Sequence, residues 1–224
     1  MDTFKRLFAL LNEDQISKIQ NAKVCIVGIG GVGSVATETL ARCGIGNFIL
    51  CDFDTVAKSN INRQIIANQN TIGRFKVDVA KEKILEINPN AKVEIIKEKF
   101  SSELSLFDFK FDYLIDAIDD INNKFLLIKT CLEKDIKFIS SMGTAKKFDS
   151  SLLKVVDINK TSYDPLAKKI RKMLRDNNIN KKFMVVSSTE EPKNSDILGS
   201  YMVVTAYSGL LLADYILKQI INSK

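Results

Sequence analysis

Residues 23–52 read KVCIVGIGGVGSVATETLARCGIGNFILCD. The run at 23–28 is short, apolar and rich in β-branched residues, which predicts a buried parallel strand. A glycine-rich turn at 28–33 follows, and the alanines and leucines of 34–44 have the spacing of a helix that closes on glycine. The run at 47–52 predicts a second strand. Strand, glycine turn, helix and strand in this order form the βαβ unit of a parallel sheet.

The same alternation of strand and helix continues along the chain. It predicts an α/β fold, a doubly wound, Rossmann-like and mostly parallel sheet. Asn88-Pro89 stops one of the helices, because the residue before a proline avoids helical backbone. The predicted elements are a helix at 76–87, strands at 93–98 and 111–119, a helix at 122–134 and a strand at 137–143.

The last third changes character, with strand candidates at 152–158 and 183–189 and a closing helix over roughly 200–221. Asp164-Pro165 is a typical helix start and opens a strongly basic helix. We therefore expect one domain with a C-terminal elaboration. Its predicted parts are an N-terminal arm or helix at 1–22, a nucleotide-binding core at 23–145 and the elaboration at 146–224.

Composition excludes several kinds of site. The 224 residues carry a net charge of +6, contain no histidine, and have four cysteines with no C-x-x-C pair. We therefore expect no zinc and no histidine general base. The cysteines fit small buried hydrophobes in a reducing compartment. The start of the chain lacks a signal-peptide pattern, and the apolar run at 202–217 is short and carries Asp214, so we expect a cytoplasmic protein outside the membrane.

The glycine turn predicts nucleotide binding. Gly28, Gly30 and Gly33 fit G-x-G-x-x-G, which lets backbone approach phosphate at a helix N-terminus. Gly31 lies within the same turn. Asp52 ends the second strand, where an acid can accept hydrogen bonds from ribose hydroxyls.

Two cations beyond that acid favour adenylation over hydride transfer. Displacing pyrophosphate from ATP requires positive charge on the leaving phosphates, and Arg63 and Lys76 supply it. Asn60 and Gln64 add neutral donors, and Asp119 could hold Mg²⁺ at the end of a strand. Each residue also has an ordinary structural role open to it, as loop ion-pair former, first-turn lysine or helix cap. Their joint occurrence favours the adenylation hypothesis.

These motifs resemble those of a known enzyme family. GIGGVG, DFDTV-x-x-SN-x-x-RQ, G-x-x-KV-[DE], INP and D-x-x-D, within residues 1–140, are similar to the ATP-dependent activating enzymes of the ubiquitin-activating, MoeB and ThiF type. The resemblance implies adenylation of a carboxylate by a homodimer, with an N-terminal arginine, here Arg6, reaching the partner's ATP. It implies an ATP site at Gly28, Gly30, Gly31, Gly33, Asp52, Asp54, Ser59, Asn60, Arg63, Gln64, Lys76 and Asp119.

Departures from the sulfur-carrier activators narrow the choice. The chain lacks their paired C-x-x-C motifs and reads NINRQ where they tend to read NLQRQ. DYLIDAID, KVVDINKTSYDPLAKKIRKMLR and SSTEEP resemble the branch of tRNA threonylcarbamoyladenosine dehydratases. That resemblance implies ATP-dependent cyclisation, with loss of water, of N6-threonylcarbamoyladenosine at position 37 of tRNA through an adenylated carboxylate. The chain looks shorter than this branch on both sides of SSTEEP, and a trimmed loop there could alter how tRNA docks.

A tRNA substrate gives the basic helix a role. Its Lys168, Lys169, Arg171, Lys172 and Arg175 could contact phosphates, although the same pattern fits a solvated helix face. The expected partners are tRNA, a second copy of the chain and a sulfur-transfer protein.

Three other functions remain open on the sequence. The first alternative is adenylation of the C-terminus of a small ubiquitin-like sulfur carrier. A protein that binds ATP without turnover is the second. A dehydrogenase comes last, because SNINRQ and GRFKVD have no role in one.

Overall fold

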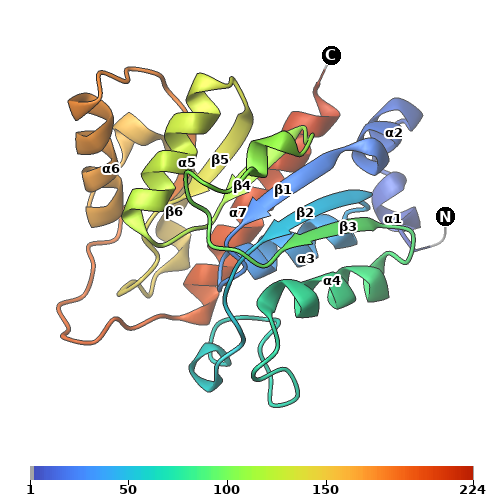
Figure 1. Cartoon of the computed structure of the whole chain (residues 1–224), viewed down its shortest axis with the longest axis horizontal. Helices are drawn as coiled ribbons and strands as arrows, with labels where there is room; N and C mark the ends of the chain where they lie inside the picture. Colours follow the sequence, from blue (N-terminus) through green and yellow to red (C-terminus); the bar gives the residue numbers. More distant parts are fainter. Residues whose placement is uncertain (1–2, 224) are drawn as a thin grey trace.

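A seven-stranded sheet organises the molecule in a computed structural model that describes residues 3–223 (Figure 1). The strand order is β3-β2-β1-β4-β5-β7-β6, and every neighbouring pair is parallel except β7 and β6. The predicted α/β sheet is thereby confirmed. The strands are β1 (Lys23–Val27), β2 (Asn47–Cys51), β3 (Lys92–Ile96), β4 (Tyr113–Asp116), β5 (Lys137–Ser141), β6 (Leu153–Asp157) and β7 (Met184–Ser188).

Helices cover both faces of the sheet, as a doubly wound fold requires (Figure 1). One hydrophobic core lies beneath α2 (Glu13–Asn21), α3 (Gly33–Arg42), α4 (Lys76–Ile87) and α7 (Met202–Ile221). A second core lies beneath α5 (Ile121–Glu133) and α6 (Pro165–Asp176) on the opposite face. The central strands are buried on both faces, which explains their unbroken apolar sequences. Among residues 3–223, no helix has the length and apolar character needed to cross a bilayer.

Some boundaries differ from those predicted. The predicted strand at 111–119 is only β4, because the Asp116 carboxylate accepts a hydrogen bond from the Ile118 N–H and turns the chain out of the sheet. The basic helix, in contrast, has its predicted bounds of 165–176, and Asn178 just beyond it adopts a left-handed φ of 57°. A short 3₁₀ helix, η1 (Lys58–Asn60), interrupts the long segment between β2 and α4.

The N-terminal segment packs beside the far end of α3. The short helix α1 (Lys5–Phe8) is followed by α2, which Asn12 and Gln15 cap reciprocally. Gly44, just beyond α3, has a φ of 86°, and a Cβ there would lie 3.1 Å from the Phe8 ring. This contact places α1 at the end of α3 that points away from the glycine turn.

Candidate functional site

The glycine turn lies where the strand order changes direction. β2 and β4 flank β1 on opposite sides, and their connections cover opposite faces, so the loops after β1 and β4 border a crevice. Gly28 has a φ of 92°, and a Cβ there would lie 2.6 Å from the Ala117 carbonyl oxygen. A Cβ at Gly33 would meet the Gly28 carbonyl oxygen at 1.8 Å. Only glycine fits at these two positions, which explains part of the motif.

Asp52 fixes the glycine turn to the end of β2. Its buried carboxylate accepts hydrogen bonds from the Ile29 N–H at 2.6 Å and the Asp54 N–H at 2.8 Å. Burial raises the pKa of Asp52, and the nearby Lys76 ammonium partly offsets this rise. A carboxylate has about four acceptor positions, so Asp52 retains capacity for a ligand hydroxyl.

Arg63 lies against the glycine turn on the segment that follows η1. Its Nη1 donates to the Ser59 carbonyl oxygen at 2.9 Å and to the Asn62 Oδ1 at 3.0 Å. The Arg63 carbonyl oxygen lies 3.2 Å from where a Cβ of Gly31 would be. Asn60 accepts from the Ala57 N–H at 3.0 Å and so shapes the turn. The guanidinium is therefore oriented by its own loop while keeping free donors.

Lys76 is the first residue of α4 and is nearly buried, with 5% of its surface exposed. Its Nζ lies 2.7 Å from the Asp54 Oδ2, and a bridge between Thr55 and Phe75 brings the two segments together. Burial and the ion pair with Asp54 hold the Lys76 ammonium at one place, unlike that of an ordinary surface lysine.

Two buried polar atoms at the glycine turn lack a hydrogen-bond partner. Within residues 3–223, the buried side-chain atoms without a hydrogen-bond partner are Ser34 Oγ and Gln64 Oε1. Ser34 lies in the first turn of α3, and the Gln64 amide nitrogen lies 3.8 Å from where a Cβ of Gly30 would be. Leaving a buried polar atom unpaired costs about 1–3 kcal/mol, so their gathering at the turn favours a polar ligand there. Sequence reasoning missed Ser34, although a serine directly after the last motif glycine was visible.

Three acids with different surroundings lie between the end of β4 and the start of α5. Asp116 is completely buried, 2.7 Å from the Lys124 Nζ and 2.6 Å from the Ser140 Oγ. Asp120 caps α5 by accepting from the Asn123 N–H at 2.9 Å. Asp119, between them, is exposed toward solvent. The buried pair of Asp116 and Lys124 was not predicted from the sequence.

The fit of Mg²⁺ to this loop can be judged from its donors. Among the described residues, no cluster of three or more His, Cys, Asp or Glu side chains could hold a metal by itself. Mg²⁺ commonly uses one or two carboxylates together with substrate phosphates. One exposed carboxylate beside a phosphate-binding turn, which Asp119 supplies, fits that requirement.

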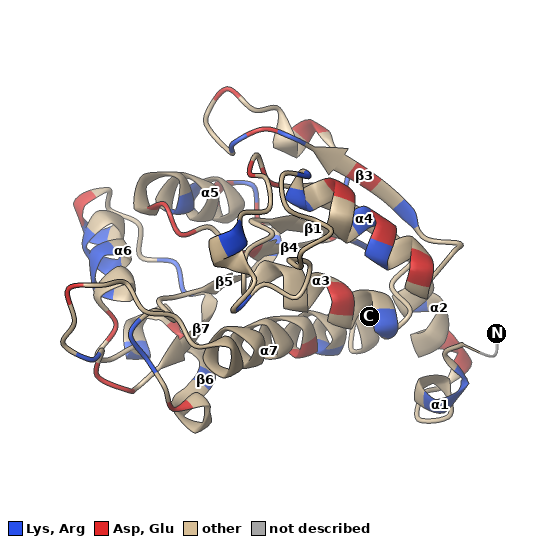
Figure 2. Ribbon diagram, turned by 90° about the horizontal axis from the view of Figure 1, so that it is seen from below, with Lys and Arg blue, Asp and Glu red and all other residues tan. Residues whose placement is uncertain are grey.

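The basic helix α6 lies at one border of the molecule, and much of its ribbon is coloured for Lys and Arg (Figure 2). Lys168, Lys169, Lys172 and Arg175 are exposed. Arg171 differs, because its Nη1 donates to the Thr161 hydroxyl, to the Thr161 carbonyl oxygen at 3.2 Å and to the Ile158 carbonyl oxygen at 3.4 Å. Arg171 thus anchors the helix to the loop before it, and its predicted contact with tRNA stays a prediction.

A buried pair seats the start of α6 near the carboxyl ends of β5 and β7. The Asp164 carboxylate caps α6 through the Ala167 N–H and also accepts from the Gly143 N–H and the Ser187 hydroxyl. The buried Lys147 Nζ lies 3.7 Å from Asp164. Burial lowers the pKa of Lys147, while the Asp164 carboxylate opposes this change. These contacts hold the start of the basic helix at the same edge of the sheet as the predicted site.

Arg6 lies far from the glycine turn of its own chain. It is exposed on α1, beside the opposite end of α3. In Figure 2, α1 lies at the periphery of the molecule, apart from the crevice. Arg6 is therefore not brought together with the other predicted ATP residues of the same chain.

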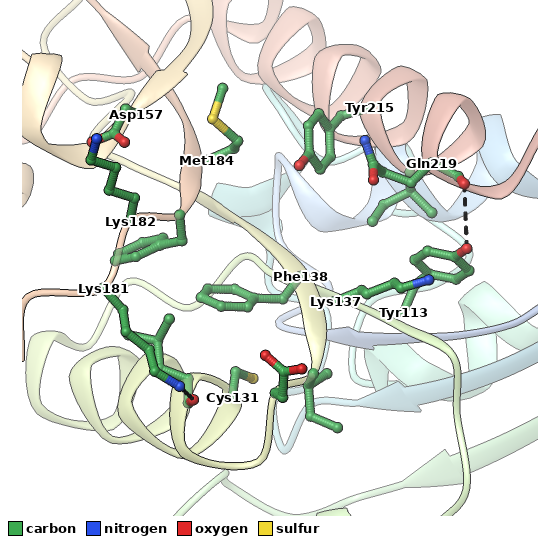
Figure 3. A pocket seen from close by; sticks show the side chains of 15 residues that line it. Tyr113, Cys131, Lys137, Phe138, Asp157, Lys181, Lys182, Met184, Tyr215 and Gln219 are labelled. Atoms are coloured by element: carbon green, nitrogen blue, oxygen red, sulfur yellow. Dashed lines mark hydrogen bonds between the residues drawn. The ribbon is translucent and has the colours of Figure 1, made fainter. Parts of the chain in front are cut away.

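A pocket of about 430 Å³ opens at the other edge of the sheet (Figure 3). Its lining includes Tyr113, Lys137 and Met184, the first residues of β4, β5 and β7, together with Tyr215 of α7. Ligands of doubly wound sheets bind at the carboxyl ends of the strands, so the crevice at the glycine turn remains the candidate site.

The cysteines are placed as inert side chains. Cys25, Cys51 and Cys131 are buried, and Cys43 is partly buried. Burial, assisted by Asp52 and Glu98, raises the pKa of Cys51 to about 12. Burial also raises the pKa of Cys25, Cys43 and Cys131. A thiol nucleophile requires the opposite shift.

We expect a variant with all four cysteines replaced by alanine to be less stable but, when folded, to keep wild-type turnover. Burial of the thiols disfavours the thiolate form that a nucleophile needs, so we expect no step to depend on a cysteine. Turnover of the purified variant, with folding checked by circular dichroism, measures this. Loss of activity in a folded variant, traced to one cysteine, would contradict it.

Comparison with known proteins agrees with this geometry. Residues 4–224 match the ThiF family. The chain is 42% identical over 191 residues to the tRNA threonylcarbamoyladenosine dehydratase of Bacillus subtilis, covering 84% of this chain and 75% of the relative. It is 38% identical over 168 residues to the Escherichia coli dehydratase, covering 74% of this chain and 63% of that protein, so it spans less than two thirds of the latter's length.

A solved structure is similar over nearly the whole chain. The E. coli tRNA N6-threonylcarbamoyladenosine dehydratase in complex with ATP superposes with a TM-score of 0.94 at 34% identity. The match covers 98% of this chain and 94% of that one. The match from residue 4 to residue 224 and the doubly wound sheet with this glycine turn agree: the chain belongs to the ThiF family.

Proposed function

We propose that this chain is an ATP-dependent tRNA threonylcarbamoyladenosine dehydratase. The observation that carries the proposal is the similarity, across 98% of the chain, to the E. coli dehydratase in complex with ATP. The unpaired polar atoms of Ser34 and Gln64 at the glycine turn support a polar ligand in the same crevice. The chain would adenylate a carboxylate and let the product cyclise.

The proposed reaction has two steps. An oxygen of the threonine carboxylate attacks the α-phosphorus of ATP, a new O–P bond forms, and pyrophosphate leaves. A nucleophilic atom of the same modified adenosine then attacks the activated carbonyl carbon and gives up its proton to solvent, while AMP leaves with one oxygen of the former carboxylate. The nucleoside has thereby lost one water. The second step is intramolecular and needs no nucleophile from the protein, which suits a chain with no histidine and no activated cysteine.

The residues have separate roles in the proposal. The glycine turn holds phosphates, and Asp52, Ser59 and Asn60 hold the nucleoside and shape its pocket. Arg63 and Lys76 stabilise the charge that develops on the phosphates, which is where fixed cations lower a barrier most. Asp54 keeps Lys76 in place through their 2.7 Å ion pair. Asp119 would hold Mg²⁺, which would neutralise phosphate charge.

A homodimer would complete the site. Arg6 is too remote to serve its own chain, so its proposed role requires a second copy. The exposed apolar side chains of Val203, Tyr207 and Leu210 lie along one face of α7 and offer a surface for that contact. The sulfur-transfer partner and the cytoplasmic location stay predictions.

The deciding experiment is mass analysis of nucleosides from tRNA that carries N6-threonylcarbamoyladenosine. Incubation with the chain, ATP and magnesium should give a nucleoside lighter by one water, with AMP formed in equal amount. ATP should bind and NAD should not bind comparably in calorimetry. Modification of a carrier protein in place of tRNA would favour the alternative function.

We expect replacement of Lys168, Lys169, Lys172 and Arg175 by glutamine to weaken tRNA binding for all tRNA sequences. Phosphate contacts carry no base information, and each one lost should lower the slope of log affinity against log salt by up to about one unit. ATP affinity should stay unchanged, because α6 lies outside the crevice. Filter binding over a range of salt concentrations measures the slope. A four-fold variant with the wild-type slope would place the tRNA surface elsewhere.

A further inference from the structure

An exposed aromatic ring is held rigidly beside the predicted site. Phe148 is 58% exposed, yet its N–H donates to both oxygens of the Glu190 carboxylate at 2.9 Å. Its ring stacks on Tyr201 with centroids 4.2 Å apart and planes inclined by 13°. The Lys193 Nζ lies 4.9 Å from the Phe148 centroid. An exposed phenylalanine with no function would not need three separate restraints.

Phe148, Glu190 and Tyr201 come from three loops at the edge of the sheet where the parallel strands have their carboxyl ends. Phe148 follows β5, Glu190 follows β7, and Tyr201 directly precedes α7. The neighbouring Ser200 carbonyl oxygen accepts from the Asn62 side chain at 3.3 Å, which ties this region to the Arg63 turn. The ring pair therefore lies on the same side of the sheet as the crevice and is connected to it by a direct contact.

The chemistry of the group fits an unpaired nucleobase. Proteins recognise single-stranded RNA by stacking bases on aromatic side chains, with nearby cations for the backbone. The Lys193 ammonium over the Phe148 ring adds a cation to the aromatic face, which is the combination that binds a base and its phosphate.

We propose that Phe148, supported by Tyr201 and flanked by Lys193, forms a stacking platform for an unpaired base of the RNA substrate close to the modified adenosine. This inference rests on the proposed function, since position 37 of tRNA lies in a loop whose bases are not all paired. Glu190 fixes the backbone of the platform, and Tyr201 fixes the plane of its ring. Lys193 can leave the ring and meet a phosphate when the base arrives.

The test compares Phe148→Leu, which keeps apolar volume without an aromatic face, with Phe148→Tyr, which keeps the face. Dissociation constants are measured for an anticodon stem-loop and for a fully paired RNA duplex of equal length. Phe148→Leu should bind the stem-loop about 5- to 150-fold more weakly, the range that corresponds to 1–3 kcal/mol for one stacked base. Phe148→Tyr should bind like the wild type. Neither variant should change duplex binding or the salt slope, since no phosphate contact is lost.

Several results would overturn the platform. One is wild-type stem-loop affinity in Phe148→Leu, and another is an equal loss for stem-loop and duplex. A changed oligomeric state at unchanged RNA affinity would make the ring a contact between copies. Failure of the proposed function is recognised separately, because the wild-type chain itself would then bind no RNA and would modify a carrier protein instead.

Discussion

Replacing Arg63 with alanine is expected to lower turnover on the order of a hundredfold or more, because it removes one donor to the developing phosphate charge. The fold should be retained, since Arg63 lies in a turn and its side chain donates to Ser59 and Asn62 of the same turn. Lys76→Ala should lower turnover by a similar factor, with an additional small effect on stability because Asp54 loses its partner. Steady-state rates of AMP formation, with folding checked by circular dichroism, measure both variants.

Arg74→Ala is the matched control for these changes. Arg74 lies in the same segment between β2 and α4, carries the same charge and is exposed, with an ion pair to Glu82. Its loss should leave turnover close to that of the wild type, because surface ion pairs contribute little. If Arg63→Ala and Arg74→Ala had equal activity while folded, Arg63 would have no role in catalysis.

The largest effect on stability is expected at the buried ion pair behind the site. Lys124→Met leaves the Asp116 carboxylate without its cation in a place with no solvent access. Breaking a buried pair on one side costs about 3–5 kcal/mol. Equilibrium unfolding in urea measures the change in the free energy of unfolding.

Lys129→Met, on the exposed side of the same helix, is the control. Its weak ion pair with Glu133 spans 3.9 Å at the surface, and the change should alter the free energy of unfolding by no more than about 0.5 kcal/mol. The double variant Asp116→Leu with Lys124→Met should recover part of the loss, because it removes both buried charges. Equal effects at Lys124 and Lys129 would refute a structural role for the buried pair.

The sequence predicted the part of the structure around the site that residues close together in the chain form. The β1 strand, the glycine turn, α3 and β2 follow from apolar periodicity and from glycines whose Cβ atoms would collide with backbone. Asp52 directly follows β2, where the end of the apolar run predicted it. The sequence motifs pointed to Arg63 and Lys76 as ATP-site residues, and the roles assigned to them stay predictions.

What the sequence could not reveal depends on contacts between distant segments. Asp116 lies on β4 and Lys124 on α5, and the loop between these two elements brings the side chains together. Their separation in the sequence does not indicate that they form a pair. Arg171 looks like its basic neighbours in sequence, but the loop at Thr161 folds back onto it. The stack of Phe148 on Tyr201 joins residues 53 positions apart and depends on two irregular loops.

The two outermost strands bear on how copies of this protein associate. β3 exposes Lys92 and Glu94, and β6 exposes Lys154 on the opposite border of the sheet. Charged residues on border strands oppose pairing of their open backbone groups with another chain, which is a route to aggregation. Growth of the sheet from one molecule into the next is therefore disfavoured at both borders. In the homodimer that we propose, the two copies would therefore meet through a helical face, such as the apolar surface of α7, and form a closed pair.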